Sequence, residues 1–344
     1  MKKIRILFAG SPEIAVPSLM ALSEMELAGE NMALAGVLTN EDSRRGRHGQ
    51  EEPTSISAAA LKLDAIRMGK GFPALPQLKF SKLDAQARKE CAGLAPDLLV
   101  SFAYGHIFGP RFLALFPCGG INIHPSRLPK YRGASPIPAA IMAGEKQTAI
   151  CIQKLYREMD AGDILAEDIF ELSGRETTLS LSETVSRRAA LLLCELLRDF
   201  GNCWASARPQ YGRAVYCREI RKEEGLINWE GSAVTIDARI RAFTPWPLSY
   251  TMLGKGMVFI LEAEPLDTMP CDPPPIKGST MDEALPGTVL GASKKHGLLI
   301  QTGDGILAVS RLKWQAKKAM DWKAFLNGAR DFIGARLGRE PDNR

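Results

Sequence analysis

Two side chains that could move protons or stabilise charge lie close together in residues 120–124, which read Gly-Ile-Asn-Ile-His. The alternation predicts a β-strand, in which residues two apart point to the same face. Asn122 and His124 would therefore share a face, with an amide donor beside a titratable imidazole. Pro125 ends the strand pairing, and a stiff loop with further prolines follows. Such strand ends often build active sites, although an isolated Asn-x-His pair is more often structural than catalytic.

The elements that must position this pair alternate along the first half of the chain. Residues 97–103 are almost continuously apolar, as a strand covered on both faces requires. Because strands alternate with helical patterns, we expect a three-layer α/β sheet. The turn after the first strand has a lone glycine, Gly10, so the Gly-x-Gly-x-x-Gly signature of NAD binding is missing. Strands are predicted at residues 4–8, 33–38, 97–103, 121–124, 149–155 and 164–171, and helices at 14–24, 55–63 and 178–200.

The pattern changes after residue 201. Residues 208–212 resemble a linker, and short apolar runs separated by glycine and proline follow it. Short, evenly spaced strands suggest a small β-barrel, and barrels of the OB type commonly bind nucleic acids. We therefore divide the chain into an N-terminal α/β domain at 1–203, a linker at 204–212 and an OB-like domain at 213–335. The expected strands are 257–261, 287–290, 297–301 and 306–312, with a proline-rich loop at 272–275.

Composition places the chain among ordinary globular proteins. Of its 344 residues, 45% are hydrophobic and 24% are charged. No apolar run reaches the ~18 residues that a membrane helix needs. The apolar stretch near the N-terminus is short and is interrupted by Arg5, so we interpret it as a core strand rather than a signal peptide and expect a cytoplasmic protein. The net charge of +5 is a mild basic excess and only weakly suggests a polyanionic partner.

The cysteines do not indicate a disulfide framework or a zinc site. There are seven, an odd number, and they are scattered without a Cys-x-x-Cys pair. Buried, reduced thiols are therefore expected, and no metal is predicted. The chain has only four histidines, so a histidine within a polar cluster carries more weight.

Several separated motifs, in the right order, together resemble the folate-dependent formyltransferases. These are the block at 122–136, the Asp-x-Gly segment at 155–163, and the segments 8–12 and 103–107. The C-terminal segments 241–247 and 315–320 resemble the branch of this family that acts on methionyl-tRNA. The resemblance covers about residues 3–330. It implies a Rossmann-like, three-layer formyltransferase domain followed by an OB-like β-barrel domain.

The resemblance also implies a reaction and a catalytic trio. A formyl group would move from 10-formyltetrahydrofolate to the amino group of methionyl-initiator-tRNA, and the family's Asn, His and Asp correspond here to Asn122, His124 and Asp160. Attack of the amine on the formyl carbon gives an oxyanion, to which an amide and an imidazolium can donate. Asp160 could hold the charge of His124 or take the amine's proton through a water. Sequence does not decide which group moves which proton. Asp160 is also a plausible turn residue before Ala161 and Gly162.

By the same resemblance, Ser126, Arg127, Leu128 and Pro129 line the formylfolate site. Backbone near Tyr104 and Gly105 would approach the pterin ring. The family usually has leucine where Arg127 stands. If the Arg127 side chain points inward it could meet the carboxylate tail of the folate, and if it points outward it is a surface charge.

The expected contacts to tRNA come from two basic segments. The loop 40–49 corresponds to a family insertion that contacts the acceptor end, and it carries Arg44, Arg45 and Arg47. Residues 294–323 hold seven Lys or Arg against two Asp, and Lys317 and Lys318 lie among them. Both segments suit phosphate contacts, yet each taken alone is more often a solvated surface.

Two alternatives stay open at this point. A formyltransferase with another acceptor, an amino sugar nucleotide or glycinamide ribonucleotide, would share the catalytic motifs. A non-catalytic RNA-binding protein on the same fold would bind tRNA without turnover. Sequence does not determine the oligomeric state, and a monomer is the starting expectation.

Overall fold

The computed structural model describes residues 3–45, 49–254, 256–270 and 284–338. Its contacts divide the chain into two compact units. The first contains residues 1–136, 147–171 and 181–218, and the second contains 137–146, 172–180 and 219–344. The predicted loop at 272–275 lies outside the described residues. No helix of the described residues is long and apolar enough to cross a membrane.

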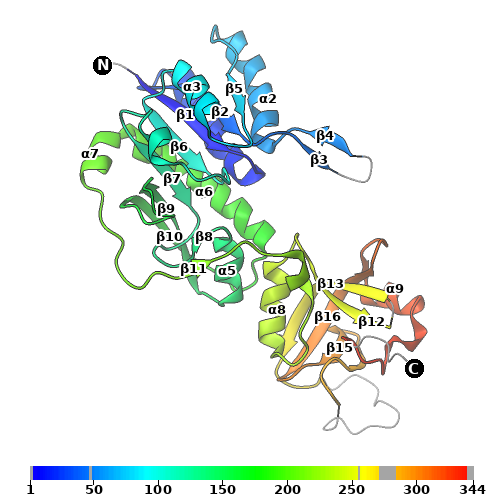
Figure 1. Cartoon of the computed structure of the whole chain (residues 1–344). Coiled ribbons are helices and arrows are strands. Elements are labelled where there is room, and N and C mark those ends of the chain that lie inside the picture. The colour runs from blue at the N-terminus through cyan, green and yellow to red at the C-terminus, as the bar shows by residue number, and fades with distance from the viewer. Residues whose placement is uncertain (1–2, 46–48, 255, 271–283, 339–344) are drawn as a thin grey trace. The chain divides into compact units, whose positions relative to one another are not determined.

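The first unit is built on a seven-stranded sheet in the order β10-β9-β7-β6-β1-β2-β5 (Figure 1). The five strands from β7 to β5 run parallel, whereas β9 is antiparallel to β7 and β10 is antiparallel to β9. The strands are β1 (Ile4–Gly10), β2 (Met32–Thr39), β5 (Gln77–Lys79), β6 (Leu98–Phe102), β7 (Gly120–His124), β9 (Gln147–Lys154) and β10 (Ile164–Glu171).

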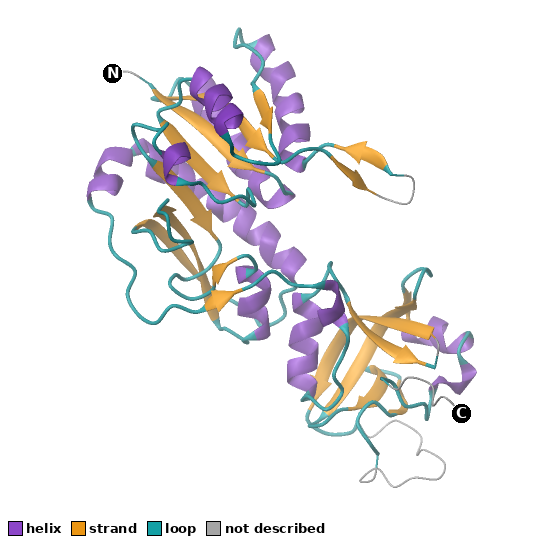
Figure 2. Ribbon diagram, viewed as in Figure 1, coloured by secondary structure: helices purple, strands orange, loops and turns teal. Residues whose placement is uncertain are grey.

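Helices lie on both faces of this sheet, which gives the expected three layers (Figure 2). Thr54 and Asp84 begin two of the helices, because each side chain accepts a hydrogen bond from backbone N–H groups of the first turn. The helices that lie wholly or partly in this unit are α1 (Val16–Leu27), α2 (Ser55–Gly69), α3 (Ala85–Gly93), α4 (Pro110–Leu113), α5 (Pro136–Met142), α6 (Thr178–Arg198) and α7 (Phe200–Ala205).

The core of the first unit follows from the composition of its central strands. All five residues of β6 and the last five of β1 are buried, because the sheet is covered on both faces. One face packs Leu7, Leu38 and Leu99 against an aromatic row. That row consists of Tyr104, Phe108, Phe112 and Phe116, whose neighbouring ring centroids are 5.4–5.7 Å apart. The segment after β6 is thereby held against the sheet.

Short strand pairs complete the first unit. The segment predicted as a polar, arginine-rich loop contains a small hairpin of β3 (Ser43–Arg45) and β4 (Gln50–Glu52). In a second pair, β8 (Arg132–Gly133) runs parallel to β11 (Tyr216–Cys217). This second pair ties the loop after β7 to a segment that lies 84 residues further along the chain.

The second unit is built on an antiparallel sheet in the order β12-β13-β16-β15-β14, with β17 beside β16. Helix α8 (Ala233–Ala242) contributes Ile236 and Ile240 to a core with strand residues, and α9 (Trp322–Asn327) contributes Phe325. The strands are β12 (Ser249–Leu253), β13 (Gly256–Leu266), β14 (Val289–Ser293), β15 (Gly297–Gln301), β16 (Ile306–Trp314) and β17 (Met320–Asp321). The predicted fold class is confirmed: an α/β, Rossmann-like N-terminal domain and a C-terminal domain on an antiparallel sheet.

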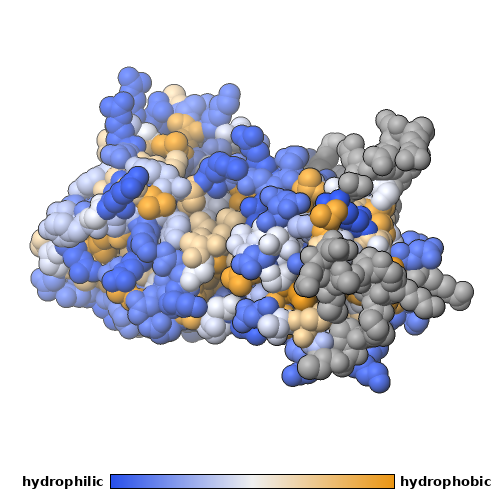
Figure 3. Space-filling view, turned by 90° about the horizontal axis from the view of Figure 1, so that it is seen from below, coloured by the Kyte–Doolittle hydropathy of each residue, from blue (hydrophilic) through white to orange (hydrophobic). Residues whose placement is uncertain are grey.

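The surface seen in Figure 3 is mostly hydrophilic, with scattered hydrophobic residues among the charged ones. Isolated apolar side chains are normal on a folded protein, since polar groups do not cover the whole surface.

Candidate active site

The strand β7 lies where the sheet changes from parallel to antiparallel pairing. Its neighbour on one side, β6, is parallel, and its neighbour on the other side, β9, is antiparallel. Asn122 pairs directly with Gln153 of β9, and His124 pairs with Cys151. Directly paired residues of antiparallel strands project to the same face, so an amide of β9 stands beside the Asn-x-His pair. His124 is buried, with 4% of its surface exposed.

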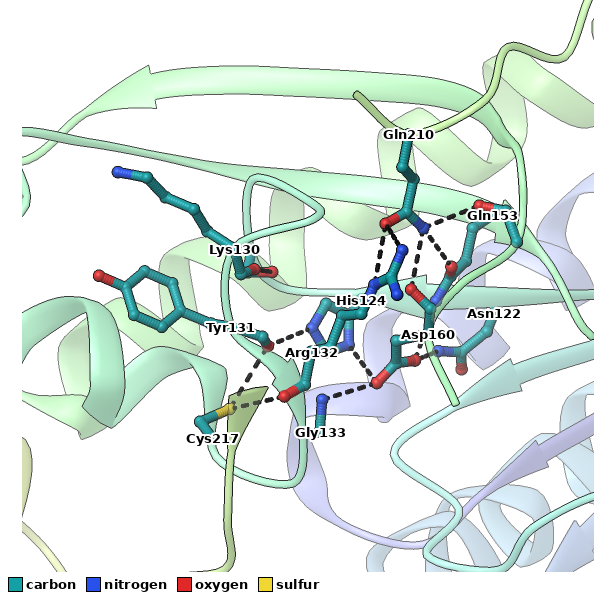
Figure 4. Close-up of polar contacts among 12 residues, drawn as sticks. Asn122, His124, Lys130, Tyr131, Arg132, Gly133, Gln153, Asp160, Gln210 and Cys217 are labelled. Atoms are coloured by element: carbon teal, nitrogen blue, oxygen red, sulfur yellow. Dashed lines mark hydrogen bonds and ion pairs between the residues drawn. The ribbon is translucent and has the colours of Figure 1, made fainter. Parts of the chain in front are cut away.

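The structure brings the third predicted residue to this pair (Figure 4). Asp160 lies in the turn between β9 and β10. The Asn122 Nδ2 donates to Asp160 Oδ1 at 3.3 Å, and His124 Nδ1 is 3.5 Å from Asp160 Oδ2. The His124 and Asp160 side chains are only 5% and 11% exposed. The three residues thus form one nearly buried polar cluster.

Two further donors hold the Asp160 carboxylate. The Gly133 N–H donates to Oδ2 at 2.9 Å, and Gln153 Nε2 donates to Oδ1 at 2.9 Å. Each oxygen therefore has a strong hydrogen bond that does not involve the predicted catalytic pair. Burying a carboxylate is costly without such donors. Asp160 is thus a hydrogen-bond acceptor held in place by donors from β8 and β9.

The imidazole of His124 is oriented from both sides. Its Nε2 is 2.9 Å from the carbonyl oxygen of Tyr131, and its Nδ1 faces Asp160. Both ring nitrogens face oxygen atoms, and an imidazolium can donate to both. The Cys217 thiol donates to the carbonyl oxygens of Tyr131 and Arg132 at 3.3 and 3.4 Å. Burial raises the pKa of Cys217, which keeps this thiol protonated as a donor.

The backbone of the Asp160 turn allows few other sequences. Asp160 has φ of 51°, in the left-handed region that aspartate tolerates better than most residues. Two residues later, a Cβ on Gly162 would lie 1.8 Å from the carbonyl oxygen of Lys154, so a side chain there requires the backbone to move. The Asp-x-Gly spacing therefore has a structural reason in addition to any chemical one.

The cluster combines an amide, an imidazole and a carboxylate, which suits proton transfer and stabilisation of a developing oxyanion. Among the residues that the structure describes, no group of three or more His, Cys, Asp or Glu side chains could hold a metal ion.

The loop predicted to line the folate site makes several contacts of its own. Ser126 is fully buried, and its hydroxyl donates to the Lys130 carbonyl at 2.6 Å. Leu128 is buried in a small apolar cluster with residues of β9 and β10, and Pro129 is buried beside it. Arg127 is exposed, which fits a surface charge better than an inward-pointing side chain. Folate contacts by this loop stay a prediction.

The segment around Tyr104 has unsatisfied polar atoms. Tyr104 is 2% exposed, and its hydroxyl is buried without a hydrogen-bond partner among the described residues. Burial raises the Tyr104 pKa well above its ordinary value, so the hydroxyl is a neutral donor and acceptor. The Oδ1 of Asn40 is also buried and unpartnered within this described part of the chain. Gly105 has φ of 90°, and a Cβ there would be 3.6 Å from Asn40 Nδ2.

The residues predicted to contact tRNA fall in both units. Arg44 and Arg45 lie on β3, and Arg47 lies outside the described residues. Lys317 and Lys318 are exposed in the turn between β16 and β17.

Two glutamines of this site were missed by the sequence analysis. Gln153 is 1% exposed although it follows four buried apolar residues, and a buried polar residue in such a strand is a usable signal. Gln210 donates to the backbone of the Asp160 turn, and it comes from the segment interpreted only as a linker. Nothing in the sequence near Gln210 indicates that it belongs to this site, because its partners lie about 50 residues earlier in the chain.

The chain thus combines a Rossmann-like domain, which carries an Asn–His–Asp cluster at the end of a sheet strand, with an antiparallel-sheet domain. The cluster has the groups that a group-transfer enzyme needs for proton transfer and oxyanion stabilisation. Residues 2–197 match the family described as "Formyl transferase", and residues 219–330 match "Formyl transferase, C-terminal domain". The chain belongs to the formyl transferase family, and it is an enzyme of formyl transfer.

Two relatives within that family match this chain over nearly its whole length. The chain is 45% identical over 334 residues to the "Methionyl-tRNA formyltransferase" of Treponema denticola, covering 96% of this chain and 98% of the relative. It is 34% identical over 331 residues to the protein of the same name from Borrelia duttonii, covering 96% and 99%. Almost the full length of both relatives is therefore matched.

Solved structures share the fold at low identity. A methionyl-tRNA formyltransferase from Clostridium thermocellum has a TM-score of 0.51 at 16% identity, over 76% of this chain and 93% of that one. HypX from Aquifex aeolicus, crystallised with tetrahydrofolic acid, has a TM-score of 0.60 at 17% identity, over 96% and 48%. An N-formyltransferase from Helicobacter canadensis, bound to folinic acid and dTDP-3-aminofucose, has a TM-score of 0.60 at 17% identity, over 89% and 98%. At these identities the likeness supports the fold alone.

Proposed function

We propose that this protein transfers the formyl group of 10-formyltetrahydrofolate to the amino group of methionyl-initiator-tRNA, giving N-formylmethionyl-tRNA for translation initiation. The observation that carries the proposal is the 45% identity, over 96% of the chain, to a methionyl-tRNA formyltransferase. The solved structures do not separate the two acceptors, because the sugar formyltransferases and the methionyl-tRNA formyltransferase among them are all 16–18% identical to this chain. The meeting of an amide, an imidazole and a carboxylate in one nearly buried cluster supports formyl transfer over a purely RNA-binding role.

In this proposal Asn122, His124 and Asp160 carry the chemistry. Asn122 has a second amide N–H besides the one that contacts Asp160, and it donates this one to the oxyanion formed when the amine attacks the formyl carbon. His124 Nε2 already faces the Tyr131 carbonyl at 2.9 Å, so the ring donates to the oxyanion through Nδ1, whose 3.5 Å separation from Asp160 Oδ2 is longer than an ordinary hydrogen bond. Asp160 holds the positive charge of the ring or receives the amine's proton through a water. An oxyanion donor of this kind contributes about 3 kcal/mol to lowering the barrier.

The formyl donor has a suitable location in the segment after β6. The unpartnered Tyr104 hydroxyl and Asn40 Oδ1 are, among the described residues, a donor and an acceptor that a polar heterocycle such as a pterin can satisfy. Gly105 has φ of 90°, a conformation that glycine adopts more easily than other residues, and it adds no side chain beside Asn40. We propose that Ser126, Arg127, Leu128 and Pro129 form the neighbouring wall, through backbone atoms where their side chains are already engaged.

The nucleic-acid contacts are proposed for Arg44, Arg45 and Arg47 of the hairpin segment and for Lys317 and Lys318. Both lysines are exposed on a short turn, where they can contact phosphates without desolvation of a buried charge. Replacing the three arginines by alanine should raise the KM for tRNA and flatten its salt dependence, with little change in KM for the folate. We expect the protein to act as a monomer in the cytoplasm, where its proposed substrate is used.

An acceptor competition tests the proposal. The enzyme is given 10-formyltetrahydrofolate with methionyl-initiator-tRNA, a dTDP-linked amino sugar and glycinamide ribonucleotide, singly and together. Formylation of the charged tRNA alone is the expected result. Formylation of another acceptor in preference to it would refute the tRNA assignment. Salt-dependent tRNA binding without any turnover would instead favour an RNA-binding protein.

A further inference from the structure

Gln210 connects the Asp160 turn to a distant part of the first unit (Figure 4). Its side-chain Nε2 is within hydrogen-bond distance of three oxygens: the Asp160 carbonyl at 2.9 Å, the Gly162 carbonyl at 2.8 Å and Gln153 Oε1 at 3.1 Å. Its backbone is placed by a β-bridge, in which Arg208 and Ile164 exchange two hydrogen bonds of 2.8 and 3.0 Å. The glutamine therefore follows closely after a segment anchored to the start of β10.

Arg132 fixes which way this amide points. Its Nε and Nη2 donate to Gln210 Oε1 at 3.1 and 2.7 Å. A guanidinium only donates, so the oxygen of Gln210 must face Arg132 and the nitrogen must face the turn. The Arg132 side chain is 12% exposed, and it also lies 3.6 Å from Glu158. This arrangement leaves Gln210 one orientation.

The fixed orientation of the Gln210 amide also determines the orientation of the Gln153 amide. Because Gln153 Oε1 accepts from Gln210, its Nε2 points to the other side, where it donates to Asp160 Oδ1 at 2.9 Å. A directed chain of hydrogen bonds thus runs from the Arg132 guanidinium through two amides to the Asp160 carboxylate. Neither glutamine belongs to the proposed catalytic trio, and the chemistry assigned to that trio does not use them.

Gln210 also acts on the backbone of the turn. Asp160 is in the left-handed region, with φ of 51°, which is an uncommon state for a residue other than glycine. Such a conformation persists where the surroundings determine it. The two carbonyls that Gln210 binds flank Ala161, so a single amide fixes the peptide on each side of the turn.

We propose that Gln210 is a positioning residue for Asp160, acting through Gln153 on the carboxylate and directly on the backbone at residues 160 and 162. The proposal rests on the role given to Asp160 in formyl transfer. It assigns the segment after α7 a part in building the active site, beyond connecting two domains. Loss of the Gln210 donor should therefore lower kcat more than it changes the KM of either substrate.

A double-mutant cycle on the full-length protein tests this inference. Gln210→Met removes the donor at similar length, and Gln210→Glu keeps the pairing with Arg132 but donates nothing. We expect both to lower kcat about tenfold or more, with KM values changed less than about twofold. In an Asp160→Asn background, Gln210→Met should change kcat by less than about twofold, because its effect acts through Asp160. Gln86→Met, at an exposed position on α3, is the matched control.

Equal losses in both backgrounds would overturn the inference, because they would indicate a general structural role. An unchanged kcat in Gln210→Met would also overturn it. Hydrogen–deuterium exchange supplies a readout independent of turnover: the peptide covering residues 158–163 should exchange faster in Gln210→Met than in Gln86→Met. Unchanged exchange contradicts the inference even if the wild-type protein proves inactive on methionyl-tRNA, and that inactivity would refute the proposed function separately.

Discussion

Asp160→Asn is the substitution whose effect the structure specifies in most detail. Its Oδ1 accepts hydrogen bonds from the side-chain amides of Gln153 and Asn122. Its Oδ2 accepts from the Gly133 N–H and faces His124 Nδ1. An asparagine can place its NH₂ toward either side, and both sides present N–H donors. At least one donor therefore loses its acceptor in either orientation, and the charge beside His124 is lost as well.

The expected magnitude follows from these contacts. Hydrogen bonds to a charged group contribute about 1.5–3 kcal/mol each, so loss of one should lower the free energy of unfolding by about 1–3 kcal/mol. Loss of a positioned proton-transfer or charge-stabilising group typically lowers kcat by about 10²–10⁴-fold. We expect a fall within that range in single-turnover formyl transfer to charged initiator tRNA, with tRNA affinity nearly unchanged.

Asp163→Asn provides the matched control. Asp163 lies shortly after Asp160 in the same connection, is 29% exposed, and accepts from the Tyr156 hydroxyl at 2.9 Å. Its carboxylate also lies 3.9 Å from Lys154 Nζ, and both of these partners are outside the proposed catalytic trio. Its conversion to asparagine should leave kcat within about twofold of wild type, because asparagine can still accept from Tyr156 and no residue of the trio contacts this side chain. The reasoning would be refuted if the two variants lost activity equally, or if Asp160→Asn kept wild-type kcat.

Three further predictions concern stability. Gly162→Ala places a Cβ 1.8 Å from the carbonyl oxygen of Lys154. We expect the free energy of unfolding, measured with denaturant, to fall by at least about 2 kcal/mol and formyl transfer to fall strongly. A variant as stable as wild type would disprove the clash. Arg67→Met leaves Glu26 as an unpaired buried charge, so the free energy of unfolding should fall by about 3–5 kcal/mol while kcat per folded molecule stays constant. An unchanged free energy of unfolding would show that the ion pair contributes nothing to stability. Burial raises the pKa of Cys91 and Cys151 from 9.0 to about 12. Between about pH 9 and 12 the folded state therefore keeps thiol protons that the unfolded state releases. The free energy of unfolding should fall as the pH rises through this range. Replacing both thiols by alanine should reduce this fall, and an unchanged slope would contradict the cause.

Local pattern was sufficient for much of the fold. The strand predicted at residues 164–171 coincides with β10, and the apolar run at 97–103 contains β6. The strand β6 could be predicted because burial on both faces dictates its apolar composition. The hairpin at residues 43–52 was predicted as a loop, because its two arms are short and carry no hydrophobic alternation.

The site was predicted in part from local spacing and in part from a family resemblance. Period-two spacing placed Asn122 and His124 on one face, whereas Asp160 was predicted because the Asp-x-Gly segment resembles that of the formyltransferases. The contacts of Gln210 could not be read in this way, because they depend on a bridge between Arg208 and Ile164 that joins segments distant in the sequence. The direction of β9, which sets Gln153 opposite Asn122, is likewise a property of the sheet and not of the strand's own sequence.

Formyl transfer from 10-formyltetrahydrofolate to methionyl-initiator-tRNA, measured for the wild-type protein and for His124→Ala side by side, tests the central claim most directly. The wild-type protein should produce N-formylmethionyl-tRNA with multiple turnovers, and His124→Ala should lower kcat by about 10²-fold or more while it binds tRNA as well as wild type does. A wild-type protein that forms no N-formylmethionyl-tRNA, or a His124→Ala variant that turns over at the wild-type rate, would contradict the account.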